Sequence, residues 1–174
     1  MIDFLSIAYL KNGTTLQQEA FFVLEKYEVM QKLSRFTPVL AGTIPLNIAT
    51  ATSDLDILCC CDDAEIFMNH IRVHFAKAEK FSLEKRIVNG ISTVIANFFL
   101  DGFEIEIFGQ NVPVQQQNGY RHMIAEAKIL AEKGENFRQE ILRLKKSGLK
   151  TEPAFAKLLN LKGDPYQALL DFFP

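Results

Sequence analysis

The spacing of apolar and polar residues divides the chain into three regions. Residues 3–35 repeat apolar side chains at roughly helical spacing, with one break at Lys11-Asn12-Gly13. This pattern predicts two helices at the N-terminus, the first capped by Asp3 and the second by Thr14 or Thr15. Residues 38–109 contain short apolar runs separated by turn residues, which predicts a sheet with one helix.

Two dipeptides carry the strongest signals for the sheet. Asn89-Gly90 and Asp101-Gly102 lie between β-rich apolar runs and favour type I′ hairpin turns. They predict three consecutive antiparallel strands, near residues 81–88, 91–100 and 103–108. Two further buried strands are expected earlier in the region, at Val39-Leu40-Ala41 and from Ser53 to Cys61.

One helix is expected between these two groups of strands. Asp62 and Asp63 can begin it, and the apolar spacing continues to about Ala78. The residues predicted on its inner side are Ile66, Phe67, Ile71 and Phe75.

From about Gly119 the chain is again predicted to be helical. A stripe of Met123, Ala127 and Leu130 precedes a second helix, marked by Ile141, Leu142 and Leu144 and ending at Ser147-Gly148. Thr151-Glu152-Pro153 and Asp164-Pro165 each combine a cap with an early proline, as at helix starts. We predict an α+β fold: a small mixed β-sheet flanked by helices, with a C-terminal helical region. Residues 1–117 would form the core, and residues 118–174 would pack on it, in one domain or two.

Composition narrows the class of protein. The chain has 174 residues, of which 48% are hydrophobic, and a formal net charge of −2. No apolar run reaches the roughly 18 residues of a membrane span, and the acidic start is unlike a signal peptide. We expect a cytoplasmic protein without a membrane partner, and the net charge does not indicate nucleic acid. Cys59, Cys60 and Cys61 are consecutive, which is typical of buried reduced thiols and unlike a disulfide framework.

A pair of aspartates is the first candidate for chemistry. Asp54 and Asp56 are predicted to lie on one strand and to project to the same face, about 6.6–7 Å apart at Cα. Two such carboxylates repel each other, and a bridging cation relieves the repulsion. Mg²⁺, or Mn²⁺, takes oxygen ligands from carboxylates and substrate phosphates. The alternative is a solvent-facing acidic edge without a ligand.

Two other segments strengthen the metal interpretation. Gly42 and Thr43 follow a buried strand, where a glycine admits a phosphate close to the backbone and a hydroxyl can donate to it. A simple turn, which Pro45 also suits, is the alternative. Farther along, Glu104 and Glu106 share one face of their strand, and either can complete an acidic triad that binds two metal ions. One carboxylate could also accept the proton of an acceptor hydroxyl.

These residues together resemble the DNA polymerase β-like nucleotidyltransferase superfamily. Gly42-Thr43, ten intervening residues and then Asp54-Leu55-Asp56 are similar to its glycine-hydroxyl turn and acidic strand, and Ser53 also fits. Over nearly the whole chain, the sequence more closely resembles an uncharacterised family of small bacterial nucleotidyltransferase-like proteins under a domain-of-unknown-function label. The segments that carry this likeness include 106–110, 149–155 and 163–166.

The resemblance implies roles for individual residues. Gly42, Thr43 and Ser53 would contact phosphate, Asp54 and Asp56 would bind metal, and Glu106 would be the preferred third acid, with Glu104 as the alternative. Three positions depart from the superfamily pattern. Thr43 replaces serine, Leu46-Asn47 replaces an Arg-Gly pair, and the third acid is glutamate instead of aspartate. The second departure removes a cation that could face phosphate.

Several residues outside this motif are weaker candidates. Arg121 or His122 could contact phosphate and Tyr120 could stack on a base, although a helix start with ordinary packing is the preferred explanation of all three. Lys145, Lys146 and Lys150 form a basic cluster that is either solvated or in contact with a triphosphate, Lys150 being the preferred ligand. His70 and His74 have zinc-compatible spacing but lack the glutamate and third ligand of a zinc helix.

Two functions fit this set of residues. The first is a metal-dependent nucleotidyltransferase, which moves a nucleoside monophosphate from a nucleoside triphosphate (NTP) to an unknown acceptor. The second is a non-catalytic nucleotide- or partner-binding module on the same fold, for instance one member of a toxin–antitoxin-like pair. The acceptor and the nucleotide base remain open, because this fold serves many chemistries.

Overall fold

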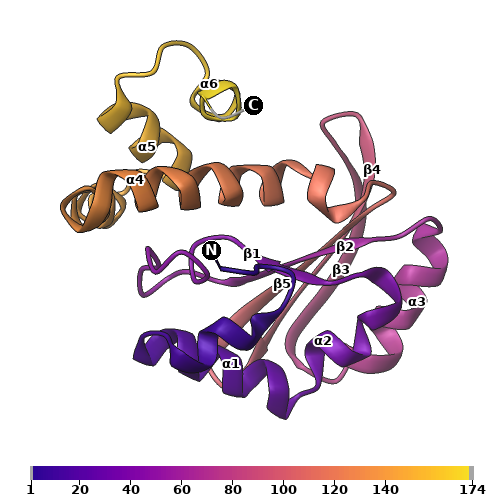
Figure 1. Ribbon diagram of the computed structural model, residues 1–174. Coiled ribbons are helices and arrows are strands. Elements are labelled where there is room, and N and C mark those ends of the chain that lie inside the picture. The colour runs from indigo at the N-terminus through magenta and orange to yellow at the C-terminus, as the bar shows by residue number, and fades with distance from the viewer. Residues whose placement is uncertain (1, 173–174) are drawn as a thin grey trace.

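A five-stranded mixed sheet forms the centre of the molecule. The structure is a computed structural model that describes residues 2–172. In the order β1-β2-β5-β4-β3, the strands are Val39–Ala41, Leu55–Cys60, Phe103–Gln110, Ile91–Leu100 and Glu79–Val88. Only β2 and β5 run parallel; the other neighbours are antiparallel. This arrangement confirms the predicted α+β fold with a small mixed sheet (Figure 1).

Both predicted hairpin turns are present. Asn89 and Gly90 have φ of 50° and 80°, and Asp101 and Gly102 have φ of 45° and 87°. Left-handed backbone at both central positions is the requirement of a type I′ turn, and it matches the twist of the flanking strands. The turns therefore join β3 to β4 and β4 to β5 without loops.

The N-terminal helices cover one face of the sheet. They are α1 (Thr15–Lys26), α2 (Val29–Lys32) and α3 (Ala64–Phe75), with short 3₁₀ turns at Ile7–Asn12 and Ser34–Phe36. The first predicted helix is thus a 3₁₀ turn, and Ser6, not Asp3, accepts a cap hydrogen bond there. They pack on the apolar side chains of β2 and β5, such as Leu55 and Ile105.

The helix α3 shows one error in the predicted inner side. Its N-cap is Asp63, whose side chain accepts from the backbone N–H groups of Glu65 and Ile66. Phe67, Ile71 and Phe75 are buried as expected. Ile66 is 47% exposed, because Met68 takes the remaining place on the buried face of the helix.

Of the C-terminal helices, the first lies over the opposite face of the sheet, and the other two pack on that helix (Figure 1). They are α4 (Asn118–Lys146), α5 (Thr151–Leu159) and α6 (Pro165–Phe172), preceded by a 3₁₀ turn at Val114–Gln116. The two helices predicted before residue 147 are present as the two halves of α4, which meet at Gly134, where the backbone is not helical (φ 75°, ψ −167°). α5 begins at Thr151 itself, with Lys150 at the N-cap.

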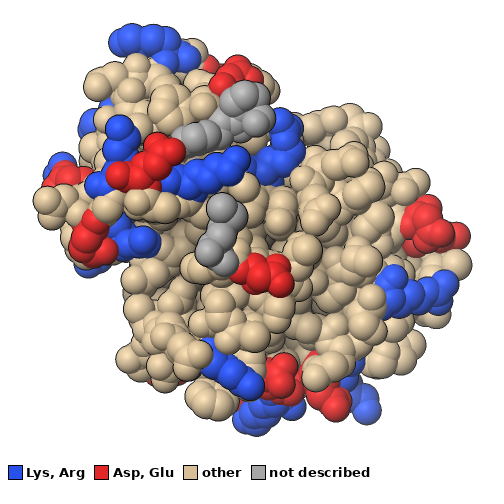
Figure 2. Space-filling view, in the orientation of Figure 1, with Lys and Arg blue, Asp and Glu red and all other residues tan. Residues whose placement is uncertain are grey.

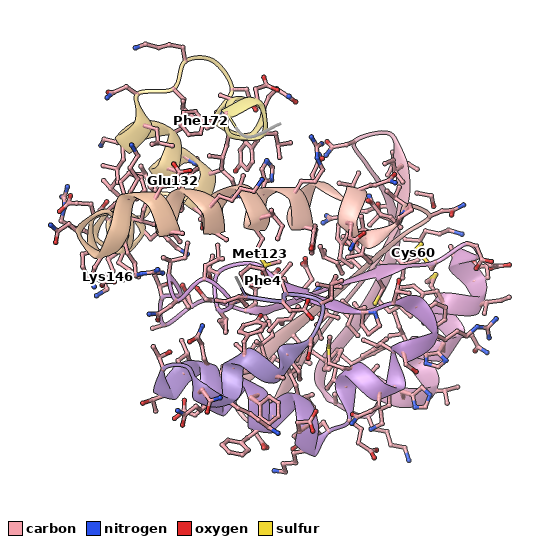
Figure 3. All side chains as sticks on the ribbon, in the orientation of Figure 1. Phe4, Cys60, Met123, Glu132, Lys146 and Phe172 are labelled. Carbon is pink, nitrogen blue, oxygen red and sulfur yellow. The ribbon has the colours of Figure 1, made fainter. Side chains whose placement is uncertain are left out.

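The C-terminal helices share one apolar core with the sheet. Met123 points from α4 toward the sheet, and Phe4 lies beneath it (Figure 3). Val39 and Leu58 from the sheet and Ile129 from α4 belong to the same cluster. Among residues 2–172, no helix is long and apolar enough to cross a membrane.

The alternation of β2 sorts its side chains between the two cores. Leu55 and Ile57 are fully buried toward the N-terminal helices, whereas Leu58 belongs to the core beneath α4. Asp56 shares the side of Leu58, because strand residues two apart point the same way. The carboxylate of Asp56 is therefore turned toward the C-terminal helices.

The three cysteines are free thiols, as expected, and burial raises the pKa of Cys61 to about 11.

Candidate nucleotidyl-transfer site

A large cleft separates the sheet from the C-terminal helices. Its volume is about 1290 Å³. From the sheet and its loops it is lined by Gly42, Thr43, Ser53, Asp54, Asp56 and Glu106. From the helical region it is lined by His122, Glu126, Lys145, Lys150, Glu152 and Tyr166. We call these two sets the sheet wall and the helical wall.

Strand register brings the predicted acids together. Asp56 on β2 lies directly opposite Glu106 on the parallel neighbour β5, and Asp54 immediately precedes β2. Glu104 is exposed, lies nearer the start of β5 and does not line the cleft. Strand alternation puts both glutamates on the same face, and the register shows that Glu106 is the one opposite Asp56.

The acids on the sheet wall are electrostatically frustrated. Burial, followed by the charges of Asp54 and Glu106, raises the pKa of Asp56 to about 8. Burial and Asp54 also raise the pKa of Glu106. Within residues 2–172, no hydrogen bond or ion pair is formed by the side chains of these three acids. A bound cation would remove the repulsion that raises both pKa values.

The donor set suits Mg²⁺ or Mn²⁺ chemically, since all three side chains offer hard oxygen ligands. The absence of a side chain at Gly42 makes room for the Asp56 carboxylate, because a Cβ there would overlap Oδ2 of Asp56. Across the described part of the chain, no three His, Cys, Asp or Glu side chains are already gathered closely enough to hold a metal ion. The acids would have to converge on an ion when it binds.

The loop between β1 and β2 is held in shape by its own hydrogen bonds. Thr43 Oγ1 donates to Ser53 Oγ at 3.1 Å, and Ser53 Oγ accepts from the N–H of Thr50 at 2.9 Å. The N–H of Ile48 donates to the carbonyl of Thr43 at 3.2 Å. Asn47 has φ of 55°, so it adopts the left-handed backbone that asparagine tolerates. Two hydroxyls are thereby placed beside the aspartate pair.

Side chains from two distant helices support this loop from behind. Gln17 on α1 is only 8% exposed, and its Nε2 donates to the carbonyls of Ile44 at 2.8 Å and Pro45 at 3.2 Å. Arg138 on α4 donates from Nη1 to the carbonyl of Leu46. Sequence reasoning missed both contacts. The only local signal was at Gln17, whose Oε1 accepts from the N–H of Thr14 in a capping box.

The helical wall is a second cluster of titratable groups that the sequence did not reveal as a unit. His122 is buried and donates from Nε2 to the carbonyl of Tyr166 at 3.0 Å, and its Nδ1 lies 3.8 Å from Oε1 of Glu152. Glu126 is 4% exposed, and burial followed by the charge of Glu152 raises its pKa well above the usual value. Burial lowers the pKa of Lys145. The helical wall thus combines acids with a partly desolvated lysine.

The two basic residues of the helical region that were predicted to bind phosphate lie in different places. Lys150 lines the cleft. Arg121 and Tyr120 do not; they line a separate hollow of about 170 Å³, and Arg121 Nη1 lies 3.5 Å from Oδ1 of Asn118. His122, the next residue of α4, lines the cleft. We therefore do not place Arg121 among the ligands proposed for this cleft.

The histidine pair on α3 contacts neighbouring helices and rings. His70 Nε2 donates to the carbonyl of Lys32 at 2.6 Å, and its ring contacts those of Phe36 and His74. Within the described residues, no cluster of three metal-binding side chains includes the pair. These contacts describe a histidine that anchors α3 to α2.

Comparison with known families gives a match over most of the chain. The model of a domain of unknown function, DUF4269, matches residues 22–172. The chain belongs to this family. A search of curated proteins finds no match. Membership thus agrees with the expected domain of unknown function and assigns no activity.

Solved structures show which fold DUF4269 shares. The Cid1 poly(U) polymerase with MgGTP bound is 11% identical, with a TM-score of 0.55 over 80% of this chain and 46% of its own. The GLD-2/RNP-8 complex is 14% identical, with a TM-score of 0.54 over 94% and 61%. The polymerase core of TRAMP is 12% identical, with a TM-score of 0.53 over 94% and 50%. This DUF4269 chain therefore has a nucleotidyltransferase-like fold and spans about half the length of these polymerases.

Proposed function

We propose that this DUF4269 protein is a metal-dependent nucleotidyltransferase that moves a nucleoside monophosphate from an NTP to an acceptor hydroxyl or phosphate. One observation carries the proposal. The register of β2 and β5 sets Asp56 against Glu106, beside Asp54 and the Thr43–Ser53 loop, on one wall of a single cleft. Clustered acids next to hydroxyl donors suit phosphoryl chemistry, in which positioning and charge neutralisation dominate catalysis.

Asp54, Asp56 and Glu106 would hold Mg²⁺ or Mn²⁺, which when bound neutralises negative charge on the phosphates. Gly42 gives the triphosphate access to the backbone, and the hydroxyls of Thr43 and Ser53 donate to its oxygens. Lys150, and Lys145 from the same wall, supply positive charge in place of the arginine absent at Leu46. Residues 1–117 would then act as the nucleotidyltransferase core, and residues 118–174 would close the cleft over the nucleotide.

The chemical step needs no other reactant. The acceptor oxygen forms a bond to the α-phosphorus while the bond from that phosphorus to the bridging oxygen breaks, and pyrophosphate leaves. The acceptor proton passes to a carboxylate of the sheet wall, which acts as the general base. We expect the reaction in the cytoplasm, where NTPs are abundant.

A second function is favoured by one observation. The acids are not already gathered around a metal site in the described chain. A module that binds a nucleotide or a partner without turnover would need only the loop, the lysines and the helical wall. Mg²⁺-dependent binding separates the two functions, because only the enzyme needs the carboxylates to hold an ion.

The test uses the purified chain with each of the four NTPs, with and without Mg²⁺. We expect thermal stabilisation by one NTP with Mg²⁺, worth about 2.7 kcal/mol at a hundredfold excess over Kd. In wild type, label from an α-³²P NTP should pass to acceptors in a cell extract. Asp54→Asn with Asp56→Asn should reduce both readouts, transfer by at least about a hundredfold.

The matched control is Glu104→Gln, which removes a carboxylate from the same strand as Glu106 but outside the cleft. It should retain binding and transfer. Full transfer by the double aspartate variant would refute the catalytic proposal. Stabilisation by an NTP that needs neither Mg²⁺ nor the aspartates would support the binding module instead.

A further inference from the structure

The cleft carries an excess of negative charge. Six acidic side chains line it, namely Asp54, Asp56, Glu106, Glu126, Glu152 and Asp164, against two basic ones, Lys145 and Lys150. Fully ionised, these groups leave a formal excess of four negative charges. Over the face drawn in Figure 2, Lys and Arg side chains gather on the C-terminal helices and along the lower edge, with Asp and Glu among them in both places.

Substrate and metal do not cancel this excess. Two Mg²⁺ ions bring four positive charges, and a fully ionised NTP brings four negative ones. The loaded cleft would therefore keep the same sign. A polyanionic acceptor has to be attracted by lysine and arginine side chains, because contacts to phosphates dominate the binding of nucleic acids. The lining of this cleft suits an acceptor of the opposite charge.

Glu126 is a carboxylate in the cleft that could pair with a positively charged acceptor. Its side chain lines the cleft from α4, yet the residue is only 4% exposed. Within residues 2–172 it forms no hydrogen bond and no ion pair. A buried carboxylate is stable when it is paired, and loses stability when it has no partner. Among the described residues, this carboxylate therefore has no partner of its own.

The surrounding groups do not supply that partner. Among the described residues, Lys145 is the lysine whose charge acts on Glu126, and it is shared with Glu152, Asp56 and Asp54. Glu152 lies 3.8 Å from Nδ1 of His122, whose other ring nitrogen is already engaged by the carbonyl of Tyr166. Two glutamates from different helices therefore face the same cavity with incomplete charge compensation.

We propose that the acceptor is a small hydroxylated compound that carries one or more ammonium groups, which Glu126 and Glu152 bind. This inference rests on the proposed function and names its acceptor class. An acceptor hydroxyl of that compound makes the bond to the α-phosphorus, pyrophosphate leaves, and the ammonium groups stay on the helical wall. The protein would then differ from the poly(U) polymerase that it resembles in fold, since an RNA end is a polyanion.

The experiment measures acceptor binding without metal or NTP. The full chain is titrated by calorimetry with 2-deoxystreptamine, a diaminocyclitol, and with myo-inositol, which has a similar ring and no amine. A fifteen-nucleotide RNA is the third probe. We expect the diamine to bind at least about tenfold more tightly than inositol, because charge-assisted hydrogen bonds are stronger than neutral ones. We expect the RNA to bind more weakly than the diamine.

Variants assign the binding to the helical wall. Glu126→Gln with Glu152→Gln should weaken diamine binding by about tenfold or more. Glu132→Gln removes an exposed glutamate of the same helix outside the cleft and should leave binding unchanged. Thermal unfolding confirms that each variant is folded, and Glu126→Gln alone serves if the double variant is not.

Three results would overturn the proposal. The first is equal binding of diamine and inositol, including no binding of either. The second is tighter binding of the RNA. The third is unchanged diamine binding in the folded glutamine variants, which would make the two glutamates structural. None of these results depends on nucleotide binding, so the wild-type experiment with NTP and Mg²⁺ tests the proposed function separately.

Discussion

The two walls of the cleft are built in different ways. The sheet wall takes its acids from two adjacent strands, where alternation and register set the direction and spacing of each side chain. The helical wall collects its residues from α4, α5 and α6, which reach the cleft only because α4 is kinked at Gly134 and α5 folds back on it. The positions of the acids are thus set by strand pairing in the sheet wall and by helix packing in the helical wall.

The walls also differ in how their charges are compensated. Within residues 2–172, no basic side chain lines the cleft from the sheet wall, and the charges of Lys145 and Arg86 offset only part of the repulsion between its acids. The helical wall itself contributes Lys145, whose charge acts on Glu126 and Glu152. The sheet wall is therefore the part of the protein that should respond most to metal and pH.

The largest expected effect is a pH dependence of folding stability that arises from the sheet wall and tests its difference from the helical wall. In the folded chain the pKa of Asp56 is raised from 3.8 to about 8. The folded state then binds more protons than the unfolded state between these values, so stability falls as pH rises from about 4 to about 8. The contribution is on the order of a few kcal/mol. Chemical unfolding across this range, without metal, measures the fall.

Asp56→Asn should flatten that pH dependence and stabilise the metal-free protein at pH 8. Glu132→Gln, an exposed carboxylate outside the cleft, should leave the slope unchanged. An equally steep fall in Asp56→Asn would mean that the repulsion lies elsewhere, for example at Glu126 on the helical wall.

A smaller effect is expected where the loop meets the aspartate. Gly42 has φ of 75°, and a Cβ there would overlap Oδ2 of Asp56. Gly42→Ala should destabilise the protein by about 2–3 kcal/mol, since left-handed backbone and the displaced carboxylate both carry a cost. Gly102→Ala has a similar φ of 87° and open space around it, so it should cost only about 1 kcal/mol. Equal losses in denaturant unfolding would show that the contact with Asp56 is unimportant.

The smallest expected effect is a change in NTP affinity, which tests which basic side chains of the helical region contact the nucleotide. Lys150 lines the cleft and Arg121 does not. Lys150→Ala should weaken NTP binding about two- to fivefold, because an exposed charge contributes less than about 1 kcal/mol. Arg121→Ala should leave Kd unchanged within the error of calorimetry. The reverse ranking would place the nucleotide on the other side of α4.

Local rules predicted much of the sheet wall. The alternation of Asp54-Leu55-Asp56 and the glycine at position 42 can be read within a few residues, and the hairpin dipeptides set both turns. The match to DUF4269 and the shared fold agree with the resemblance of those motifs. The metal, the nucleotide and the acceptor remain proposals.

Where prediction failed, a distant part of the chain decided the outcome. Ile66 turned outward since Met68 occupied the core. Arg121 lines a separate hollow on α4, and no signal in the sequence predicted that placement.

The sequence by itself determined the acidic face of β2, the two type I′ turns and the glycine-hydroxyl loop, because these depend on neighbours in the chain. Only the tertiary structure decided between Glu104 and Glu106, since that choice depends on the register of β5 against β2. It also brought Glu126, Lys145 and Glu152 to one cavity. Their separation along the chain leaves no local periodic signal, and packing of helices on a sheet is what joins them.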